Sequence, residues 1–371
     1  WETSGAGIDL LSGKNSGTYK LDVSSYGQAT YWNGSADTGF PMTDSATYTG
    51  TFNLYYGAST TATQASAFSG TGFFNFNGIG QTYTLDKANT YPGETQIDAG
   101  TVALSGSLDS ASTIYIGNGG NGEAAALSLS GTTTLGNNIV VNPSSGSGSR
   151  TLAKTDATSQ TASGAVTLDR AATFDVADNG NLNLSGAVSG ANALTKAGAG
   201  TLVLSGAGTN TVSGNVSVNA GTLVLGKSAG VDAVSGSISV SSSAVLTNAA
   251  ANQINDGDGV SISSGGTWWL GGNNETVASL DVDGTLALGT GQVVVNGGNS
   301  EWTGAVSASS GGSVVFKADT TSITGNNSGM ASGSAIYAVG GVLGLNNNGA
   351  AGSSTIYLGE TFGTGGVTLD S

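Results

Sequence analysis

The chain has 371 residues, of which 63 are Gly, 3 are Pro and 9% are charged. Regularly spaced Val, Ile and Leu residues accompany this Gly content, so the chain is predicted to fold and not to stay disordered. A net charge of −15, with single scattered basic residues, excludes nucleic acid as a partner and disfavours an anionic membrane surface.

The sequence contains no Cys and no His. A disulfide framework, a Ser-His-Asp triad and an ordinary zinc site are therefore all excluded. No apolar run approaches the ~20 residues that span a bilayer, so no membrane insertion of this chain is expected. The sequence begins at Trp1 without Met, and we expect it to be an already processed product without a signal peptide.

Residues 1–91 differ from the rest because they hold 16 of the 25 aromatic residues. Examples are Tyr31-Trp32 and Phe73-Phe74-Asn75-Phe76. We expect an aromatic-filled β cap or small β-domain over residues 1–91, followed by the main body over residues 92–371. The alternative is an aromatic platform for sugar rings, since exposed Trp and Tyr stack well on carbohydrate.

A Gly followed by alternating apolar positions recurs along the main body. The copies are Gly100–Leu104, Gly180–Leu184, Gly200–Leu204, Gly221–Leu225, Gly266–Leu270, Gly284–Leu288, Gly312–Phe316 and Gly341–Leu345. Alternation with a period of two predicts strands with one buried face. No helical stripe appears, and an antiparallel sandwich would need hairpin turns at shorter intervals.

A second ladder runs in step with the first and sets the length of the repeat. It consists of Val216, Ile238, Val260, Leu280 and Val306, with partners two residues on that end at Ala308. Recurrence near 22 residues predicts that each coil places the same side chain above its predecessor. The sequence thus predicts an all-β parallel solenoid of about 22 residues per coil. The residues predicted to point inward are Leu182, Leu202, Leu223, Val245, Trp268 and Leu286.

Two stretches, Leu85–Leu104 and Leu194–Leu225, share a further pattern. In both, a turn Gly (Gly93 or Gly214) lies seven positions before the Gly that opens the next strand (Gly100 or Gly221). These stretches resemble the autotransporter-associated β-strand repeat, or passenger-associated transport repeat. The resemblance implies a right-handed parallel β-helix on or beyond the bacterial outer membrane, and it assigns no catalytic residue.

Acidic residues gather weakly in two places. Asp256 and Asp258 lie about one coil before Asp281 and Asp283, so the four carboxylates could approach one another and hold Ca²⁺. Asp also suits solvated turns, and an EF-hand-like downstream Glu is missing. We therefore expect no metal and no cofactor, with these four residues as weak calcium candidates.

Parallel β-helices also include polysaccharide lyases and hydrolases. Such active sites need clustered carboxylates, commonly with Arg, Lys or His, on one face. Arg150 and Arg170 lie several coils from the acidic pairs. The chain is therefore not expected to be an enzyme.

The last residues predict how the chain assembles. Ser354–Gly359 echoes the interior segment Ser112–Gly117, and an unpaired coil end invites pairing with another chain. Contact between this end and the N-terminal region of a second copy would not close, and would give a head-to-tail filament. The predicted interface residues are Trp1, Ile356, Tyr357, Leu358, Val367 and Leu369.

The predicted function is that of an extracellular structural protein, exported through the outer membrane and assembling with itself into a fibre. The alternative is a monomeric passenger adhesin that binds glycans or cell surfaces. A polysaccharide lyase or hydrolase is the third and weakest interpretation.

Overall fold

The computed structural model describes residues 2–4, 7–11, 20–22, 28–33, 47–49, 51–56, 61–63, 67–70, 73–117, 122–142, 147–317, 319–346, 349–358 and 367–370, some of them by their backbone alone. These residues form strands and connections and include no helix. Accordingly, no helix in the described ranges could span a membrane. The chain divides into two compact units, Trp1–Gly186 and Ala187–Ser371.

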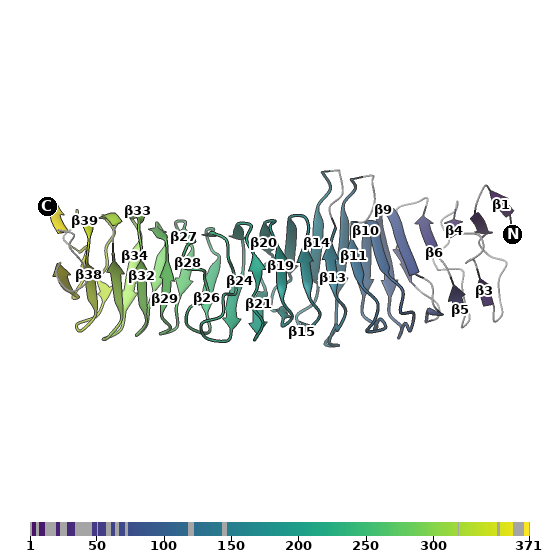
Figure 1. Cartoon of the computed structure of the whole chain (residues 1–371), viewed down its shortest axis with the longest axis horizontal. Helices are drawn as coiled ribbons and strands as arrows, with labels where there is room; N and C mark the ends of the chain where they lie inside the picture. The colour runs from purple at the N-terminus through teal and green to yellow at the C-terminus, as the bar shows by residue number, and fades with distance from the viewer. Residues whose placement is uncertain are drawn as a thin grey trace. The chain divides into compact units, whose positions relative to one another are not determined.

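The first unit is a stack of parallel coils (Figure 1). Its strands are β1 (Glu2–Ser4), β2 (Gly7–Leu11), β3 (Lys20–Asp22), β4 (Gln28–Asn33), β5 (Thr47–Thr49), β6 (Thr51–Tyr56), β7 (Thr61–Thr63), β8 (Ser69–Gly70), β9 (Phe73–Leu85), β10 (Thr95–Leu104), β11 (Ile114–Ile116), β12 (Ala125–Leu129), β13 (Ile139–Val141), β14 (Arg150–Lys154), β15 (Ser159–Ala162), β16 (Val166–Leu168), β17 (Ala172–Val176) and β18 (Asn181–Leu184). Strand β1 pairs with β2 antiparallel. From β2 onward the strand pairs of this unit are parallel, and β9 pairs with β10 across the predicted boundary at residues 91/92.

Aromatic side chains fill the interior of the coils near residue 80. Phe68, Phe74, Phe76, Tyr83 and Tyr91 are all buried, and they are the aromatic residues of 1–91 whose side chains the structure describes. Phe68 and Phe74 stack with ring centroids 4.6 Å apart, and Phe74 meets Tyr91 at 4.5 Å. These five rings therefore belong to the core and are closed to sugar.

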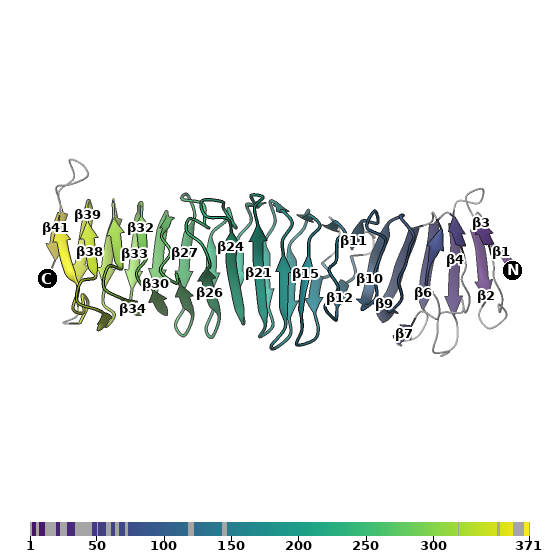
Figure 2. The ribbon, with the colours of Figure 1, turned by 90° about the horizontal axis from the view of Figure 1, so that it is seen from below.

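The second unit is also a parallel β-solenoid (Figure 2). Its strands are β19 (Val188–Gly190), β20 (Leu194–Ala197), β21 (Thr201–Gly206), β22 (Thr211–Val212), β23 (Val216–Val218), β24 (Thr222–Lys227), β25 (Ile238–Val240), β26 (Val245–Asn248), β27 (Gly259–Ile262), β28 (Thr267–Trp269), β29 (Glu275–Val277), β30 (Ser279–Val282), β31 (Thr285–Ala287), β32 (Gln292–Val295), β33 (Gly298–Trp302), β34 (Ala305–Ala308), β35 (Ser313–Phe316), β36 (Asp319–Ile323), β37 (Gly329–Met330), β38 (Ala335–Ala338), β39 (Gly341–Leu345), β40 (Thr355–Leu358) and β41 (Val367–Asp370).

Three sheets run along this second unit. We call them sheet I (β20, β23, β25, β27, β30, β33, β36, β39, β41), sheet II (β21, β24, β26, β28, β31, β34, β37) and sheet III (β29, β32, β35, β38, β40). In sheet I, Ser217 and Ser239 lie 22 residues apart in adjacent strands and their hydroxyls meet. This interval confirms the predicted coil length.

The predicted inward ladder is confirmed at five of its positions. Leu182 in the first unit and four residues of sheet II are fully buried, namely Leu202, Leu223, Trp268 and Leu286. In sheet II these residues lie in one column, because each strand pairs in register with the next. Their burial supplies the core of the coils, at roughly 2 kcal/mol or more for each large apolar side chain.

The prediction for Val245 is wrong. Val245 faces outward and is half-buried, and Leu246 occupies the column between Leu223 and Trp268. The alternation around this strand carries apolar residues at both parities, so the pattern alone does not decide which set points inward. Register decides it, and thereby places Asn248 inside the core.

The end of the second predicted ladder is also wrong. Val306 pairs with Leu286 in sheet II and does not lie beside Leu280 in sheet I. Ala308 likewise belongs to sheet II, and Trp302 takes the place beside Val282. The sequence pattern merged strands of the two sheets into one ladder. It did so because Val306 of sheet II follows Leu280 of sheet I at nearly the expected interval.

Two equivalent glycines, Gly221 directly before β24 and Gly100 within β10, are required by geometry. Gly221 has a φ of 62°, and a Cβ there would lie 2.3 Å from the Gly200 carbonyl oxygen. Gly100 has a φ of 82°, and a Cβ would lie 2.2 Å from the Gly78 carbonyl oxygen. Both the left-handed backbone and the close approach of the previous coil exclude a side chain.

We expect Gly221→Ala to lower the free energy of unfolding by at least about 2 kcal/mol, through strain and contact with backbone that cannot give way. Thermal unfolding followed by circular dichroism measures the loss. Gly208→Ala is the matched control, because a Cβ at Gly208 meets nothing within 4 Å. Equal melting temperatures for the two variants would contradict the prediction.

Candidate functional site

A buried asparagine joins three successive coils in the second unit. The Val188 N–H donates to Asn210 Oδ1 at 2.8 Å, and Asn210 Nδ2 donates to the Ala233 carbonyl at 2.9 Å. Val188 lies 22 residues before Asn210, and Ala233 lies 23 residues after it. The amide therefore satisfies one backbone group of the preceding coil and one of the following coil.

The same bridge occurs elsewhere in the chain. In the first unit, Asn89 Oδ1 accepts from the Phe68 N–H at 2.8 Å, and Asn89 Nδ2 donates to the Ser107 carbonyl at 3.3 Å. In the second unit, Asn327 accepts from the Val306 N–H at 2.7 Å. An amide has both a donor and an acceptor, so a single residue type can serve both neighbours.

Lys196 is fully buried, and its ammonium group is held by backbone carbonyls. Its Nζ donates to the carbonyls of Ala197 at 2.6 Å, Gly198 at 2.7 Å and Ala220 at 3.1 Å. These three bonds use all three donors of the ammonium group. The lysine therefore ties the end of β20 to the turn that precedes β24 in the next coil.

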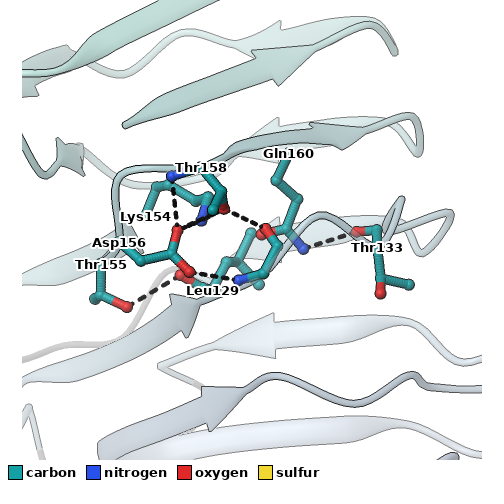
Figure 3. Close-up of polar contacts among 8 residues, drawn as sticks. Leu129, Thr133, Lys154, Thr155, Asp156, Thr158 and Gln160 are labelled. Atoms are coloured by element: carbon teal, nitrogen blue, oxygen red, sulfur yellow. Dashed lines mark hydrogen bonds and ion pairs between the residues drawn. The ribbon is translucent and has the colours of Figure 1, made fainter. Parts of the chain in front are cut away.

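A second buried lysine is held by side chains (Figure 3). Lys154 Nζ forms an ion pair with Asp156 Oδ1 and donates to Thr158 Oγ1 at 2.9 Å. The other carboxylate oxygen of Asp156 accepts from the Gly131 N–H at 2.6 Å. Burial lowers the pKa of Lys154. The two charged groups hold this turn in place and bind it to the neighbouring coil.

A pocket of about 250 Å³ lies beside this cluster, in the first unit. Gln160 belongs to its wall, and Gln160 Nε2 donates to the Thr133 carbonyl at 2.8 Å. The remaining lining residues are Leu104, Gly106, Ser107, Leu108, Ser110, Thr134, Leu135, Gly136 and Asn137. No lining residue is charged, so the pocket offers no acid or base for proton transfer.

A buried carboxyl group lies inside the second unit. Glu275 Oε2 accepts from Asn248 Nδ2 at 2.6 Å and from the Gln253 N–H at 2.8 Å. Asn248 Oδ1 in turn accepts from Trp268 Nε1 at 2.9 Å. Burial raises the pKa of Glu275 to about 7, and the hydrogen bonds that it accepts oppose this rise without cancelling it.

Asn89 lies in one of two stretches of the sequence that match a known family, and Lys196 and Asn210 lie in the other. Residues 80–104 and residues 194–225 match the family of the passenger-associated transport repeat. The chain carries two such repeats. The resemblance drawn from Leu85–Leu104 and Leu194–Leu225 is confirmed. Neither a curated protein nor a solved structure matches the chain.

The two repeats place equivalent residues in equivalent positions. Asn89 and Asn210 supply the bridging amides, and Gly100 and Gly221 supply the left-handed backbone that follows. Asn327 lies outside both matched stretches and makes the same kind of bridge. The structural unit therefore recurs where the sequence of the passenger-associated transport repeat is no longer recognisable.

The weak calcium candidates do not come together. Asp258 lies beside Ala278 just before strands β27 and β30, whereas Asp281 lies within β30 and Asp283 directly follows it. Along the strand, Asp281 lies three residues and Asp283 five residues beyond this level, or roughly 10 and 16 Å. Asp283 Oδ1 accepts from Thr303 Oγ1 at 2.5 Å. The expectation of no metal site, with Asp256, Asp258, Asp281 and Asp283 as weak calcium candidates, stays a prediction. Within the described ranges, no group of three acidic side chains is placed to hold a metal.

Most of the predicted assembly residues lie at the edge of what the structure describes. Trp1 and the side chains of Val367 and Leu369 lie outside the described residues. The backbone of β41 pairs in parallel with β39. Tyr357 and Leu358 in β40 are 50% and 42% exposed, and Ile356 is half-buried. The assembly interface itself stays a prediction.

The arginines considered for catalysis are not placed on an open face together. Arg150 is buried, and burial followed by the nearby charge of Arg170 lowers its pKa. Its guanidinium packs over Gly117, where a Cβ would collide with it. Arg150 therefore fills the interior of the first unit.

Sequence reasoning missed the bridging asparagines, although the signal was present. Both repeats contain Asn-Thr-x-x-Gly, at Asn89–Gly93 and Asn210–Gly214. The glycine of this pattern indicates a turn, whereas its asparagine is easily taken for a solvated turn residue, because Asn is typical of such turns. No sequence signal marked Lys196 or Glu275 as buried, since the compensating groups are backbone atoms or come from other coils.

We expect Asn210→Ala to lower the free energy of unfolding by about 2–4 kcal/mol, because the Val188 N–H and the Ala233 carbonyl lose their partner inside the protein. Urea unfolding measures the change. Asn219→Ala is the control, since Asn219 is exposed and its replacement should cost less than about 0.5 kcal/mol. A difference between the two variants smaller than the error of the measurement would show that the bridge carries no stability.

Glu275 predicts a pH dependence of stability in the second unit. The folded protein keeps the Glu275 proton up to about pH 7, whereas the usual pKa of the group is 4.5. The associated stability is complete below pH 4.5 and is lost as the pH rises through 7, by about 3 kcal/mol in all. The free energy of unfolding of Glu275→Gln should not show this decrease between pH 4.5 and 8. The control Glu301→Gln, at an exposed residue, should still show it. Parallel curves for the two variants would refute the assignment.

Proposed function

We propose that this chain is part of an autotransporter passenger, displayed at or released from a bacterial surface, with a structural or adhesive role. The carrying observation is that both passenger-associated transport repeats form coils of a parallel β-solenoid. The residues that the two repeats share, Asn89 with Asn210 and Gly100 with Gly221, build the corners of the fold. The repeats therefore contribute architecture, and the proposed location follows from their family.

The proposed structural role is self-assembly through the coil that contains β40. Phe316, Ala338 and Leu358 follow one another in an inward column of sheet III. Phe316 and Ala338 are buried, whereas Leu358 is 42% exposed. Beside it, Tyr357 stacks on Tyr337 at 4.7 Å with an interplanar angle of 11°, and is 50% exposed. A core position and an aromatic stack are thus left partly uncovered, and a coil from a second copy would cover both.

We include in the proposal that the chain is not an enzyme. The support is compositional, because His and Cys are absent from the sequence. In addition, the hydrogen bonds of Lys154 and Asp156 are directed at groups of the chain itself. A second function, adhesion to glycans by a monomeric passenger, is favoured by the exposed Trp269 in sheet II.

The self-assembly proposal predicts oligomers that grow with concentration in sedimentation velocity, and filaments in electron micrographs. Leu358→Asp should shift the protein to monomer, because it places a charge in the proposed contact. Ile79→Asp is the matched control, since Ile79 is 65% exposed in the first unit and should leave assembly unchanged. A wild-type protein that is monomeric at every concentration would remove the fibre and leave the monomeric adhesin.

A further inference from the structure

The outward face of sheet II is built from two columns of uncharged side chains, all of them small except for one Trp. One column contains Thr201, Thr222, Val245, Thr267, Thr285 and Ala305. The other contains Val203, Val224, Thr247, Trp269, Ala287 and Ser307. We call these two columns the Thr/Val face. Methyl and hydroxyl groups are mixed over it at the spacing of the strands.

The Thr/Val face is uncharged although the chain has a net charge of −15. None of its positions is acidic or basic, and Lys227 at the end of β24 is buried. The exposed acids of the same coils lie outside the two columns, Asp281 and Glu301 in strands β30 and β33 of sheet I and Asp283 in the turn before β31. The two columns themselves thus carry no charge and acids lie around them, so this face suits an uncharged partner and disfavours a polyanion.

A single large aromatic side chain projects from this face. Trp269 is 51% exposed, whereas its neighbour Trp268 and the more distant Trp302 are buried. The indole N–H of Trp268 donates to Asn248, and that of Trp302 donates to the Leu280 carbonyl. Within the described ranges the indole N–H of Trp269 has no such acceptor. Trp269 therefore offers both a ring and an unused donor.

Unused hydroxyl groups surround this indole. Thr247 lies directly beside Trp269 in the next strand, and Thr267 precedes it by two residues on the same face. Thr285 lies beside Thr267 in the strand on the other side. In the described part of the chain, none of these three hydroxyls makes a hydrogen bond. Each can therefore donate to, and accept from, a ligand.

The dimensions of this group match a sugar. Adjacent strands are about 4.8 Å apart and residues i and i+2 are about 6.6 Å apart, so Trp269 and the three threonines cover roughly 10 by 7 Å. A pyranose ring has an apolar C–H face, which packs on an aromatic ring, and a rim of hydroxyls, which pair with hydroxyls and N–H groups. Ala287, next to Trp269 in its column, leaves room beside the indole.

We propose that the Thr/Val face binds a neutral hexose polysaccharide, with Trp269 as the platform and Thr247, Thr267 and Thr285 as hydrogen-bonding partners. The inference takes its biological setting from the proposed surface display. Binding is measured on the isolated protein, so a failure to bind polysaccharide can be distinguished from a failure of the proposed surface display. The repeating strands would let a chain of sugars lie across several coils.

Affinity electrophoresis tests the proposal, in native gels cast with galactomannan, with mixed-linkage β-glucan or with dextran sulfate. The wild-type protein should be retarded by at least one of the two neutral polysaccharides and not by the sulfated one. Trp269→Ala should weaken this retardation at least tenfold, and Trp269→Tyr should restore most of it. Ile79→Ala, which removes an exposed apolar side chain in the first unit, is the control and should bind like wild type.

Two further measurements separate the proposal from its alternatives. Thr247→Val and Thr285→Val keep the shape of the face and remove a hydroxyl, so each should weaken binding several-fold at an unchanged melting temperature. Bound polysaccharide should also shield Trp269 from acrylamide quenching of tryptophan fluorescence. The proposal is overturned if neither neutral polysaccharide retards the protein, or if Trp269→Ala binds as well as wild type. Preference for dextran sulfate would overturn the neutral ligand. Loss of self-association in Trp269→Ala without loss of retardation would assign the face to contacts between copies.

Discussion

Stacking in register is the constraint on which the rest of this molecule depends. Each coil is a single layer of side chains thick, and its backbone groups bond to the coils on either side. A residue that points inward must therefore fit the residues at the same position in both neighbours, as Leu223 fits Leu202 and Leu246. The corners obey the same rule, and at Gly221 the backbone of the previous coil leaves no space for a Cβ.

The same constraint explains why polar groups can be buried here. A corner breaks the ladder of backbone hydrogen bonds and leaves donors and acceptors inside the protein, where an unpaired group costs free energy. Asn210 meets this need with one amide shared between two coils, and Lys196 meets it with an ammonium group that accepts no bond and donates three. Such residues also fix the register, because a slip by one residue would leave both the side chain and its partners unsatisfied.

Much of this fold could be predicted from the sequence, because the two-residue period of the apolar positions and the repeat interval near 22 residues are visible in the sequence alone. The placement of single residues was less accessible. Val245 and Leu246 are both apolar, and only the pairing with Leu223 shows which one is inside. Adjacent residues Trp268 and Trp269 are identical in the sequence, yet one fills the core and the other projects from sheet II. Glu275 is held by groups that lie 22 and 27 residues away, which no local pattern records.

Burial of basic side chains has a further effect, on digestion. The sequence contains only 9 Lys and Arg residues, and four of them, Arg150, Lys154, Lys196 and Lys227, are at most 1% exposed. Arg150 and Lys154 also lie in β14, which is hydrogen-bonded to β12 on one side and to β17 on the other. A protease with the specificity of trypsin must draw such a residue into its own cleft as an extended, unpaired chain. To cut at these residues, the protease must first separate a strand from its two neighbours. The stacking of the coils therefore also protects these four basic residues from cleavage.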